Sequence, residues 1–536
     1  MKKNIDCLII GHNEMSLEEY ESIMKTSGTN SESYRELNLS FIEYEKKKYS
    51  AKDIFNYLMP KDELKSKGPL SFGNLFSATI AYLMTFLVKK GFECDYINYF
   101  NMEKEELAHK LQNDKIMTVA ITTTMYVTPF PIMEIISFIR QYNKSAKIIV
   151  GGPFVHANTT TQEVNMLQYI LKSIDADIYI SNSQGETAFV NVLSALKENK
   201  SLEGIKNVIY KGDTDYNINP YEAEDNDINE NLINWPMFSD RIKAFATIRT
   251  SISCPFSCAF CTFPQRAGKY RPMQLEAYEK EMDSLKKTGN VKKINFIDDT
   301  FNVPPERFKS ILRMMIKNKY GFKWNSFLRC QYIDRETVEL MKESGCEGVF
   351  LGIESGSQKI LQNMNKAANI EKYKEGLALL NEYGIISFAS FIIGFPGETY
   401  DTYMETVKFI EEHKPTFYRV QAWYFDSLSP VFKDKEKYKL TGARMKWSHS
   451  TMDSMEVSKL VEQTFSSVKN SIWIPQFNFD YLSIYLLLER GMDLDSIKKF
   501  LTSFNSVVAR KLINSECNEA DEKDIYNISQ IFNSKG

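Results

Sequence analysis

The sequence predicts an α/β protein with several domains, and three observations indicate this fold class. Up to about residue 211, short apolar runs alternate with helical patterns, which is typical of a doubly wound parallel sheet. Between residues 241 and 430, strand and helix units recur in a way that suits a partial (β/α)6 barrel. From residue 431 to residue 536 only apolar helical stretches recur, which indicates a small helical C-terminal domain. A chain of 536 residues exceeds the size of one core, so about two to four domains are expected.

The first domain is expected over residues 1–211. Ser16 and Glu19 form the Ser-x-x-Glu pattern of a capping box, so a helix should follow the first strand. Another helix is expected over residues 77–90, and residues 27–57 are interpreted as an irregular insertion. The expected strands cover residues 6–11, 94–100, 117–124, 147–152 and 177–181.

Residues 212–240 are predicted to form a linker, because this stretch is acidic, rich in Asn and without clear periodicity. The barrel domain is expected over residues 241–430, and its first helix presents Leu275, Tyr278 and Met282 on one face and stops at Gly289. The six barrel strands are expected over residues 246–252, 292–298, 324–329, 348–354, 385–393 and 417–425. The C-terminal helices are expected over residues 455–468, 481–489 and 494–508.

The amino-acid composition limits the binding partners and the cellular compartment that we expect for this protein. The net charge of −3 and the isoelectric point near 6.1 provide no basic surface, so no nucleic acid partner is expected. The first apolar run is too short for a secretory signal, and no stretch approaches the roughly 20 apolar residues that span a membrane. We therefore expect a cytoplasmic protein without a membrane partner, whose eight Cys are reduced thiols or cluster ligands.

The most informative motif is the sequence Cys-Pro-Phe-Ser-Cys-Ala-Phe-Cys, which places Cys254, Cys258 and Cys261 close together. Three thiolates at this spacing can bind three irons of a [4Fe-4S] cluster and leave the fourth iron open. Chance would give this spacing with a probability of roughly 0.002, so it is a specific signal. The alternative is a structural zinc site, which needs four ligands, and the other candidates His156 and Cys330 are distant in sequence.

The cysteine spacing, the aromatic residue before the third cysteine and the preceding apolar strand together resemble the radical S-adenosylmethionine (SAM) superfamily. The resemblance implies that Cys254, Cys258 and Cys261 hold the cluster and that the amino and carboxylate groups of SAM complete the open iron. It implies reductive cleavage of SAM to a 5′-deoxyadenosyl radical, a partial barrel fold, and a backbone approach of Phe260 to the adenine.

Further SAM-binding residues are expected where the barrel strands end, because ligands of α/β folds bind at the carboxyl ends of strands. The resemblance implies that Asp298 or Asp299 accepts hydrogen bonds from the methionine ammonium, although the Gly-Gly-Glu form of that motif is absent. A helix cap is the alternative role for these residues. Arg329 is expected to pair with the methionine carboxylate through its planar fork, or else to form an ordinary ion pair.

The later strand ends add four candidates for SAM binding. Residues 352–357 resemble the Gly-Ile-Glu-Ser-Gly stretch of the family, in which Glu354 and Ser355 would face the ribose and methionine. An ionised Glu at the end of an apolar run is costly to bury without a partner, which favours a function for Glu354. Gly394 would let the backbone approach the adenine closely, and Gln421 is a candidate for the adenine pocket.

Small residues at strand ends of the first domain resemble the cobalamin-binding domain that precedes the barrel in many radical enzymes. They would let the backbone lie against the macrocycle or its nucleotide tail. The Asp-x-His-x-x-Gly motif that supplies a cobalt ligand in other cobalamin proteins is absent, as it usually is in cobalamin-dependent radical enzymes. A degenerate domain that binds nothing is the alternative. The residues assigned to cobalamin are Gly73, Thr122, Thr123, Thr124, Gly151, Gly152, Pro153, Ser181, Gln184, Gly185 and Glu186.

Together the domains resemble class B cobalamin-dependent radical SAM methyltransferases. The resemblance implies methylation of an unactivated carbon in a small-molecule or peptide natural product, with electrons from an external flavodoxin or ferredoxin. Residues 31–41 faintly resemble natural-product P-methyltransferases, which implies a phosphinate phosphorus as the other acceptor. No catalytic residue is assigned, and the candidates for the substrate wall are Trp423, Tyr424, Trp447 and His449.

Two other functions stay open. A cobalamin radical enzyme can catalyse cyclisation or rearrangement without methylation, and a non-catalytic cobalamin or cluster sensor would use the same cofactors. A methylthiotransferase is disfavoured, because it needs more cluster cysteines in the first domain, where only Cys7 and Cys94 occur.

Overall fold

The computed structural model describes residues 2–124, 126–513 and 519–533. The chain divides into two compact units whose segments alternate along the sequence. None of the helices in the described ranges has the length and apolar character needed to cross a membrane. The first unit comprises Met1–Met15, Leu75–Pro255 and Phe263–Lys293, and the second comprises Ser16–Asn74, Phe256–Thr262 and Ile294–Gly536.

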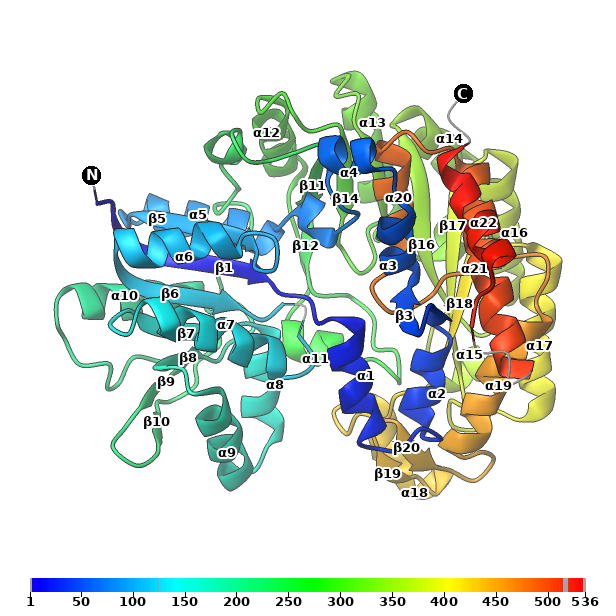
Figure 1. The fold of residues 1–536 in the computed structure, drawn as a ribbon, viewed down its shortest axis with the longest axis horizontal. Helices are drawn as coiled ribbons and strands as arrows, with labels where there is room; N and C mark the ends of the chain where they lie inside the picture. The colour runs from blue at the N-terminus through cyan, green and yellow to red at the C-terminus, as the bar shows by residue number, and fades with distance from the viewer. Residues whose placement is uncertain (1, 125, 514–518, 534–536) are drawn as a thin grey trace. The chain divides into compact units, whose positions relative to one another are not determined.

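The first unit is built on a sheet with the strand order β10-β9-β8-β7-β6-β1-β5 (Figure 1). The strands from β8 to β5 are parallel, while β9 and β10 are antiparallel. Strands are added on both sides of β1, so the predicted doubly wound sheet and its five strands are confirmed. The strands are β1 (Asn4–His12), β5 (Cys94–Tyr99), β6 (Lys115–Thr122), β7 (Lys147–Gly151), β8 (Ile178–Ile180), β9 (Val208–Lys211) and β10 (Tyr216–Ile218).

Helices follow the strands of the first unit, as the sequence predicts. Ser77 accepts a hydrogen bond from the backbone of Ile80 and so caps α5 at the expected start. The helices are α5 (Ala78–Lys89), α6 (Lys104–Asn113), α7 (Phe130–Tyr142), α8 (Pro153–Thr161), α9 (Val164–Ile174), α10 (Glu186–Lys197), η2 (Trp235–Phe238), α11 (Phe263–Ala267) and α12 (Leu275–Lys286). The short strands are β4 (Leu75–Phe76), β11 (Phe245–Ile248), β12 (Ser251–Ile252) and β13 (Arg271–Pro272). The strand predicted over residues 246–252 corresponds to β11 and β12.

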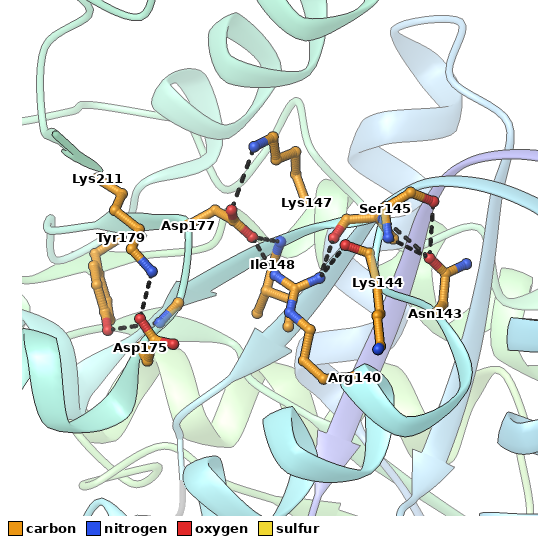
Figure 2. Close-up of polar contacts among 12 residues, drawn as sticks. Arg140, Asn143, Lys144, Ser145, Lys147, Ile148, Asp175, Asp177, Tyr179 and Lys211 are labelled. Atoms are coloured by element: carbon orange, nitrogen blue, oxygen red, sulfur yellow. Dashed lines mark hydrogen bonds and ion pairs between the residues drawn. The ribbon is translucent and has the colours of Figure 1, made fainter. Parts of the chain in front are cut away.

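Charged side chains close the amino-terminal edge of the first sheet, beside β7 and β8 (Figure 2). Asp177 accepts hydrogen bonds from Arg140 at 2.5 Å and from the backbone N–H of Ile148 at 2.8 Å. Lys147 lies 3.4 Å from the other carboxylate oxygen of Asp177. These contacts tie α7, β7 and the start of β8 together.

In the second unit, β21, β18, β17, β16, β15 and β14 lie side by side in that order. The neighbouring strands from β15 to β21 are parallel, as expected for a partial barrel. The strands are β14 (Lys293–Phe296), β15 (Lys323–Leu328), β16 (Cys346–Glu354), β17 (Ile386–Ile393), β18 (Phe417–Ala422) and β21 (Ile472–Trp473). The intervening helices are α13 (Pro305–Lys317), η3 (Cys330–Tyr332), α14 (Arg335–Glu343), α15 (Gln358–Asn363), α16 (Ile370–Glu382) and α17 (Tyr400–His413).

Residues 16–74 also belong to the second unit, although their sequence position suggests the first domain. The expectation of an irregular insertion over residues 27–57 is wrong, because Ser31 and Ser50 cap helices there and a hairpin lies between them. The predicted capping box at Ser16 is present. The elements are α1 (Leu17–Lys25), α2 (Glu32–Asn38), β2 (Phe41–Tyr44), β3 (Lys47–Ser50), α3 (Ala51–Leu58), α4 (Lys61–Lys67) and η1 (Phe72–Asn74).

Long-range contacts explain why this segment joins the C-terminal part of the chain. Lys511 donates to the backbone oxygens of Asn38 at 2.7 Å and of Phe41 at 2.8 Å. Arg490 donates to the backbone oxygens of Gly68 and Pro69. These side chains satisfy carbonyls at segment ends that local sequence patterns leave open.

The region beyond residue 430 contains the three predicted helices, but also short strands that were not predicted. A small hairpin pairs β19 with β20, and β21 extends the barrel sheet. The predicted linker contains β10, which pairs with β9. The elements are η4 (Pro430–Asp434), α18 (Lys435–Tyr438), β19 (Thr441–Ala443), β20 (Lys446–Ser448), α19 (Ser454–Ser467), α20 (Tyr481–Glu489), α21 (Leu494–Ile513), α22 (Glu522–Ser529) and η5 (Gln530–Phe532). The domain boundaries at residues 211, 240 and 430 stay a prediction.

Candidate functional site

The cysteine loop is anchored within the second unit by backbone hydrogen bonds. The N–H of Ala259 donates to the carbonyl of Met364 at 2.7 Å, and the N–H of Val431 donates to the carbonyl of Ala259 at 2.9 Å. The side chain of Asn365 donates to the carbonyl of Ser257 at 2.9 Å. The residues that follow α15 and those that begin η4 therefore fix the conformation around Cys258.

The three cysteines differ in their surroundings. Cys258 is buried, whereas Cys254 and Cys261 are partly exposed. Cys254 falls in a segment of the first unit, and the other two belong to the second. Within the described part of the chain, no three side chains of Cys, His, Asp or Glu are gathered as a metal site.

Arg329 places a buried positive charge directly against the cysteine loop. It follows β15, and its guanidinium donates to the sulfur of Cys258 at 3.1 Å and to the carbonyl of Lys366. The guanidinium carbon lies 3.3 Å from the ring centre of Phe256, and the Nε atom has no hydrogen-bond partner. A guanidinium in this position favours negative charge on sulfur. The chemistry of this loop therefore fits an anionic iron–sulfur cluster.

Glu354 occupies a strained backbone position at the end of β16. Its φ angle is +64°, in the left-handed region that residues other than glycine rarely adopt. The pairing register of β16 and β17 shifts between Gly352 and Glu354. As in a β-bulge, this shift changes the direction in which the Glu354 side chain points. A Cβ atom on Gly352 would lie 2.5 Å from a carboxylate oxygen of Glu354, so only glycine fits there.

The partner of Glu354 is Lys366, a residue that the sequence analysis did not identify. The Lys366 ammonium lies 2.7 Å from Oε1 of Glu354, and only 7% and 11% of the two side chains is exposed. The ammonium also lies 5.6 Å from the ring centre of Phe260. Lys366 follows α15 in a stretch without periodicity, so no sequence signal marked it.

Ser355 is turned towards the protein. It is fully buried, its hydroxyl lies 3.2 Å from that of Thr406, and it accepts from the N–H of Ser357 at 3.1 Å. A Cβ atom on Gly356 would collide with the backbone of α17, so this turn packs closely on that helix. Ser355 thus shapes the turn, while the buried hydroxyl of Ser357 has no partner.

The turn after β17 is held by hydrogen bonds to both backbone polar groups of Gly394, and we call this arrangement the Gly394 clamp. The Gly394 N–H donates to the carboxyl group of Glu398, and its carbonyl lies 3.0 Å from Nε2 of His449. Gly394 has a φ angle of +87°, and a Cβ atom there would lie 2.6 Å from Val457. Glu398 is fully buried, its Oε1 has no partner, and desolvation raises its pKa to about 8.

Aromatic side chains predicted for the substrate wall meet at this clamp. Trp447 and His449 stack at 5.1 Å between ring centres, and the Trp447 indole donates to the carbonyl of Trp423 at 2.8 Å. Trp423 is buried beside Phe395, and its own indole N–H has no partner. Tyr424 is about half exposed. Three of the four predicted wall residues therefore come together, and Tyr424 lies outside them.

Two further strand ends carry predicted residues. Asp298 is buried after β14, and desolvation together with the charge of Asp298 raises the pKa of Asp299 to about 7. Gln421 on β18 accepts a hydrogen bond from Arg419 at 2.6 Å. The roles of these residues in SAM binding stay predictions.

The predicted cobalamin residues of the first unit lie at the carboxyl ends of β6, β7 and β8, which are neighbours in the sheet. The Thr123 hydroxyl donates to the carbonyl of Gly151 at 2.9 Å and accepts from the N–H of Phe154 at 3.2 Å. Gly152 has a φ angle of +112°, and a Cβ atom there would lie 2.9 Å from the Thr123 hydroxyl. Gly73 is the exception, since it falls in η1 of the second unit.

The polar candidates at the end of β8 have protein partners. Glu186 is buried and accepts from Asn226 at 2.8 Å, and desolvation raises its pKa despite the positive charge of Arg249. Gln184 accepts from the backbone N–H of Asn226 at 2.7 Å. The Ser181 hydroxyl contacts that of Thr159. These contacts order the turn, and its proposed ligand role is untested.

Comparison with known proteins identifies the central part of the chain. Residues 248–410 match the model of the Radical SAM superfamily. These residues are a radical SAM domain. The match confirms the predicted resemblance at the domain that carries the cysteine motif, and with it the prediction of a [4Fe-4S] cluster and SAM.

Relatives and solved structures extend the likeness beyond the radical SAM domain. An uncharacterised methyltransferase of Pyrococcus horikoshii is 26% identical over 382 residues, which cover 68% of this chain and 80% of that protein. The cobalamin-dependent SAM radical enzyme OxsB has a TM-score of 0.56 and 14% identity, over 99% of this chain and 79% of that chain. The radical SAM methyltransferase TsrM of Kitasatospora setae has a TM-score of 0.54 and 18% identity, over 69% and 74%. These structures confirm the predicted fold class.

Proposed function

We propose that this protein is a class B, cobalamin-dependent radical SAM methyltransferase. Its substrate would be a small-molecule or peptide natural product, methylated on an unactivated carbon or a phosphinate phosphorus. The observation that carries the proposal is the presence of a radical SAM domain in a chain whose fold matches OxsB over 99% of its length. OxsB and TsrM have been solved with cobalamin bound, and TsrM and the Pyrococcus horikoshii relative are described as methyltransferases.

The residues of this chain have distinct roles in the proposal. Cys254, Cys258 and Cys261 hold the cluster, and Arg329 holds positive charge against Cys258. When bound, the cluster supplies the electron that cleaves SAM, and cobalamin supplies the methyl group. Glu354 provides a buried carboxylate for the ammonium or hydroxyl groups of SAM, in exchange for its contact with Lys366.

Other parts of the site orient SAM and exclude water. The clamp on Gly394 fixes a backbone turn where the adenine is expected, and the buried Trp423 and Trp447 keep solvent away from it. In the first unit, the strand ends around Thr123 and Gly152 offer backbone without bulky side chains to cobalamin. A flavodoxin or ferredoxin would provide electrons, and the protein would act in the cytoplasm without nucleic acid.

The proposal is tested by anaerobic purification with added cobalamin, followed by iron and cobalt analysis and mass spectrometry of products. With a pool of candidate substrates, methylation yields 5′-deoxyadenosine and S-adenosylhomocysteine in equal amounts. Formation of deoxyadenosine without S-adenosylhomocysteine would indicate that the protein catalyses a cyclisation or rearrangement and not a methylation. Absence of any SAM cleavage would instead favour a sensor.

A further inference from the structure

Basic side chains are concentrated in the second unit between residues 433 and 446, a stretch that we call the basic segment. It contains the end of η4, the short helix α18 and the hairpin of β19 and β20 (Figure 1). The segment has a formal charge of +4, whereas the whole chain has −3, so the charge of the whole chain does not reveal it. Its basic residues are Lys433, Lys435, Lys437, Lys439, Arg444 and Lys446, and its acidic residues are Asp434 and Glu436.

The charges of this segment are not used to hold the fold together. All six basic residues are exposed. Lys435 lies 4.0 Å from Glu436 within the same segment, at the limit of an ion pair. Within the described ranges, the other five basic side chains form no ion pair. Their positive charges are therefore available to a binding partner of opposite charge.

The basic segment begins directly beside the cysteine loop. The N–H of Val431 donates to the carbonyl of Ala259 at 2.9 Å, and Ala259 lies between Cys258 and Cys261 in the sequence. The first basic side chain, Lys433, follows two residues after Val431. The positive charges therefore start next to the loop that is proposed to hold the cluster.

Backbone contacts hold the rest of the segment in place. Phe425 and Arg444 exchange two backbone hydrogen bonds, of 2.9 Å and 2.7 Å. The N–H of Ser450 donates to the carbonyl of Tyr438 at 2.9 Å. A surface that is ordered before binding loses less conformational entropy when a partner docks. The segment is therefore suited to binding without rearrangement.

Aromatic side chains connect the cysteine loop to the surface beside the basic segment. The last of them, Phe432, is 37% exposed, and the ammonium of Lys435 lies 5.4 Å from its ring centre. Docking surfaces commonly combine an apolar centre with a polar rim, and Phe432 supplies an apolar contact here. The ring centres follow one another at 6.5, 5.5, 5.1 and 6.0 Å in the order Phe260, Phe395, Trp423, Phe425 and Phe432.

The chemistry of the radical SAM domain defines the partner that this surface suits. Reductive cleavage of SAM consumes one electron, which a reduced carrier protein must deliver. The carrier is oxidised by one electron, the cluster is reduced by one, and no bond forms or breaks between the two proteins. A carrier of negative charge is steered towards a positive surface, which raises its association rate. Complexes of redox proteins are small and transient, so a short charged segment is sufficient.

We propose that the basic segment and Phe432 form the surface on which an acidic electron-carrier protein, a flavodoxin or a ferredoxin, docks to reduce the cluster. This inference rests on the proposed function and adds the place where electrons enter. It assigns the positive charges to a redox protein, and not to a nucleic acid or an anionic membrane.

The first experiment measures binding to the full-length, anaerobically purified protein by thermophoresis. The probes are an oxidised flavodoxin and an oxidised ferredoxin, both of negative net charge, together with polyuridine RNA and phosphatidylglycerol vesicles. In the triple variant Lys433→Gln, Lys437→Gln and Lys439→Gln, we expect the carrier to bind about tenfold more weakly at about 50 mM salt. The difference should shrink at about 0.5 M salt, because the charges are exposed and are screened. The carrier that binds more tightly is the assigned partner.

The matched control removes three positive charges elsewhere in the second unit. It is the triple variant Lys372→Gln, Lys374→Gln and Lys408→Gln, whose side chains are exposed on α16 and α17. A second experiment compares SAM cleavage driven by the reduced carrier with cleavage driven by dithionite, a small reductant that needs no docking surface. The basic-segment variant should lose about tenfold of the carrier-driven rate and keep the dithionite-driven rate, and the control should keep both.

Three outcomes would overturn the proposal. They are equal carrier binding by the two triple variants, no binding of either carrier to the wild type, and binding of RNA or vesicles in preference to the carriers. Circular dichroism checks that the variants fold, as expected for exposed side chains. If the wild type does not cleave SAM with dithionite, only the proposed function is refuted, because carrier binding is measured without turnover and still decides this inference.

Discussion

Two regions of this molecule hold their charged groups in opposite ways. At the amino-terminal edge of the first sheet, Asp177 is surrounded by Arg140, Lys147 and a backbone N–H, and each contact joins neighbouring elements. At the strand ends of the radical SAM domain, Glu354 adopts a positive φ angle and the Nε of Arg329 has no partner. Native structures rarely leave buried groups unsatisfied or strained without a reason. Because Asp175 at the first edge also has a positive φ angle, the difference lies in the buried, unpartnered Nε of Arg329, which is consistent with the ligand role proposed for the strand ends of the radical SAM domain.

The largest expected effect comes from the cysteine loop. Cys258→Ser removes the sulfur that Arg329 contacts and one proposed cluster ligand. We expect loss of the cluster absorption after reconstitution and no detectable deoxyadenosine. Cys94→Ser is the matched control, since Cys94 lies on β5 outside the loop. Full iron loading and turnover in Cys258→Ser would show that the loop does not hold the cluster.

The next largest effect concerns the buried ion pair. Lys366→Met leaves the carboxylate of Glu354 buried without its partner, which should lower the free energy of unfolding by about 3–5 kcal/mol at neutral pH. Urea unfolding followed by circular dichroism measures this change. The double variant Lys366→Met with Glu354→Gln should recover most of the loss, and Lys372→Met, an exposed pair with Glu375, serves as control. Equal stability of Lys366→Met and the wild type would show that the pair is not buried in solution.

These two sites also show what the sequence could predict. Cys258 could be predicted from the spacing of the three cysteines. Arg329 and Glu354 could be assigned because the alternating patterns show where their strands end. Lys366 could not, because its contact with Glu354 depends on tertiary packing between segments with no local signature. His449 was a candidate for the substrate wall, but its contact with Gly394 could not be predicted for the same reason. The same reason explains residues 27–57, whose helices are capped locally but depend on Lys511 for their place.

A smaller effect should appear in the pH dependence of stability. Glu398 has a pKa of about 8 in the folded protein, against an ordinary value of 4.5, so the folded state holds this proton more tightly. The contribution of Glu398 to stability should therefore be most favourable below about pH 4.5, and it should fall by up to about 1.4 kcal/mol per pH unit as pH rises towards 8. Glu398→Gln should flatten this slope in urea titrations between these limits. Glu412→Gln, an exposed residue paired with Lys408, should keep the wild-type slope. A wild-type slope in Glu398→Gln would mean that Glu398 is ionised when folded.

The smallest effect is expected at the amino-terminal edge of the first sheet, where Asp177 is paired with Arg140 and Lys147. Asp177→Asn removes the charge that Arg140 and Lys147 share but keeps an oxygen for the N–H of Ile148. Because the side chain is 19% exposed and solvent weakens the ion pairs, we expect a loss of about 1 kcal/mol in the free energy of unfolding. SAM cleavage per iron should stay at the wild-type level, since Asp177 contacts none of the proposed ligand residues. A variant that keeps its stability but loses SAM cleavage would place function at the amino-terminal edge and erase the distinction between the two regions.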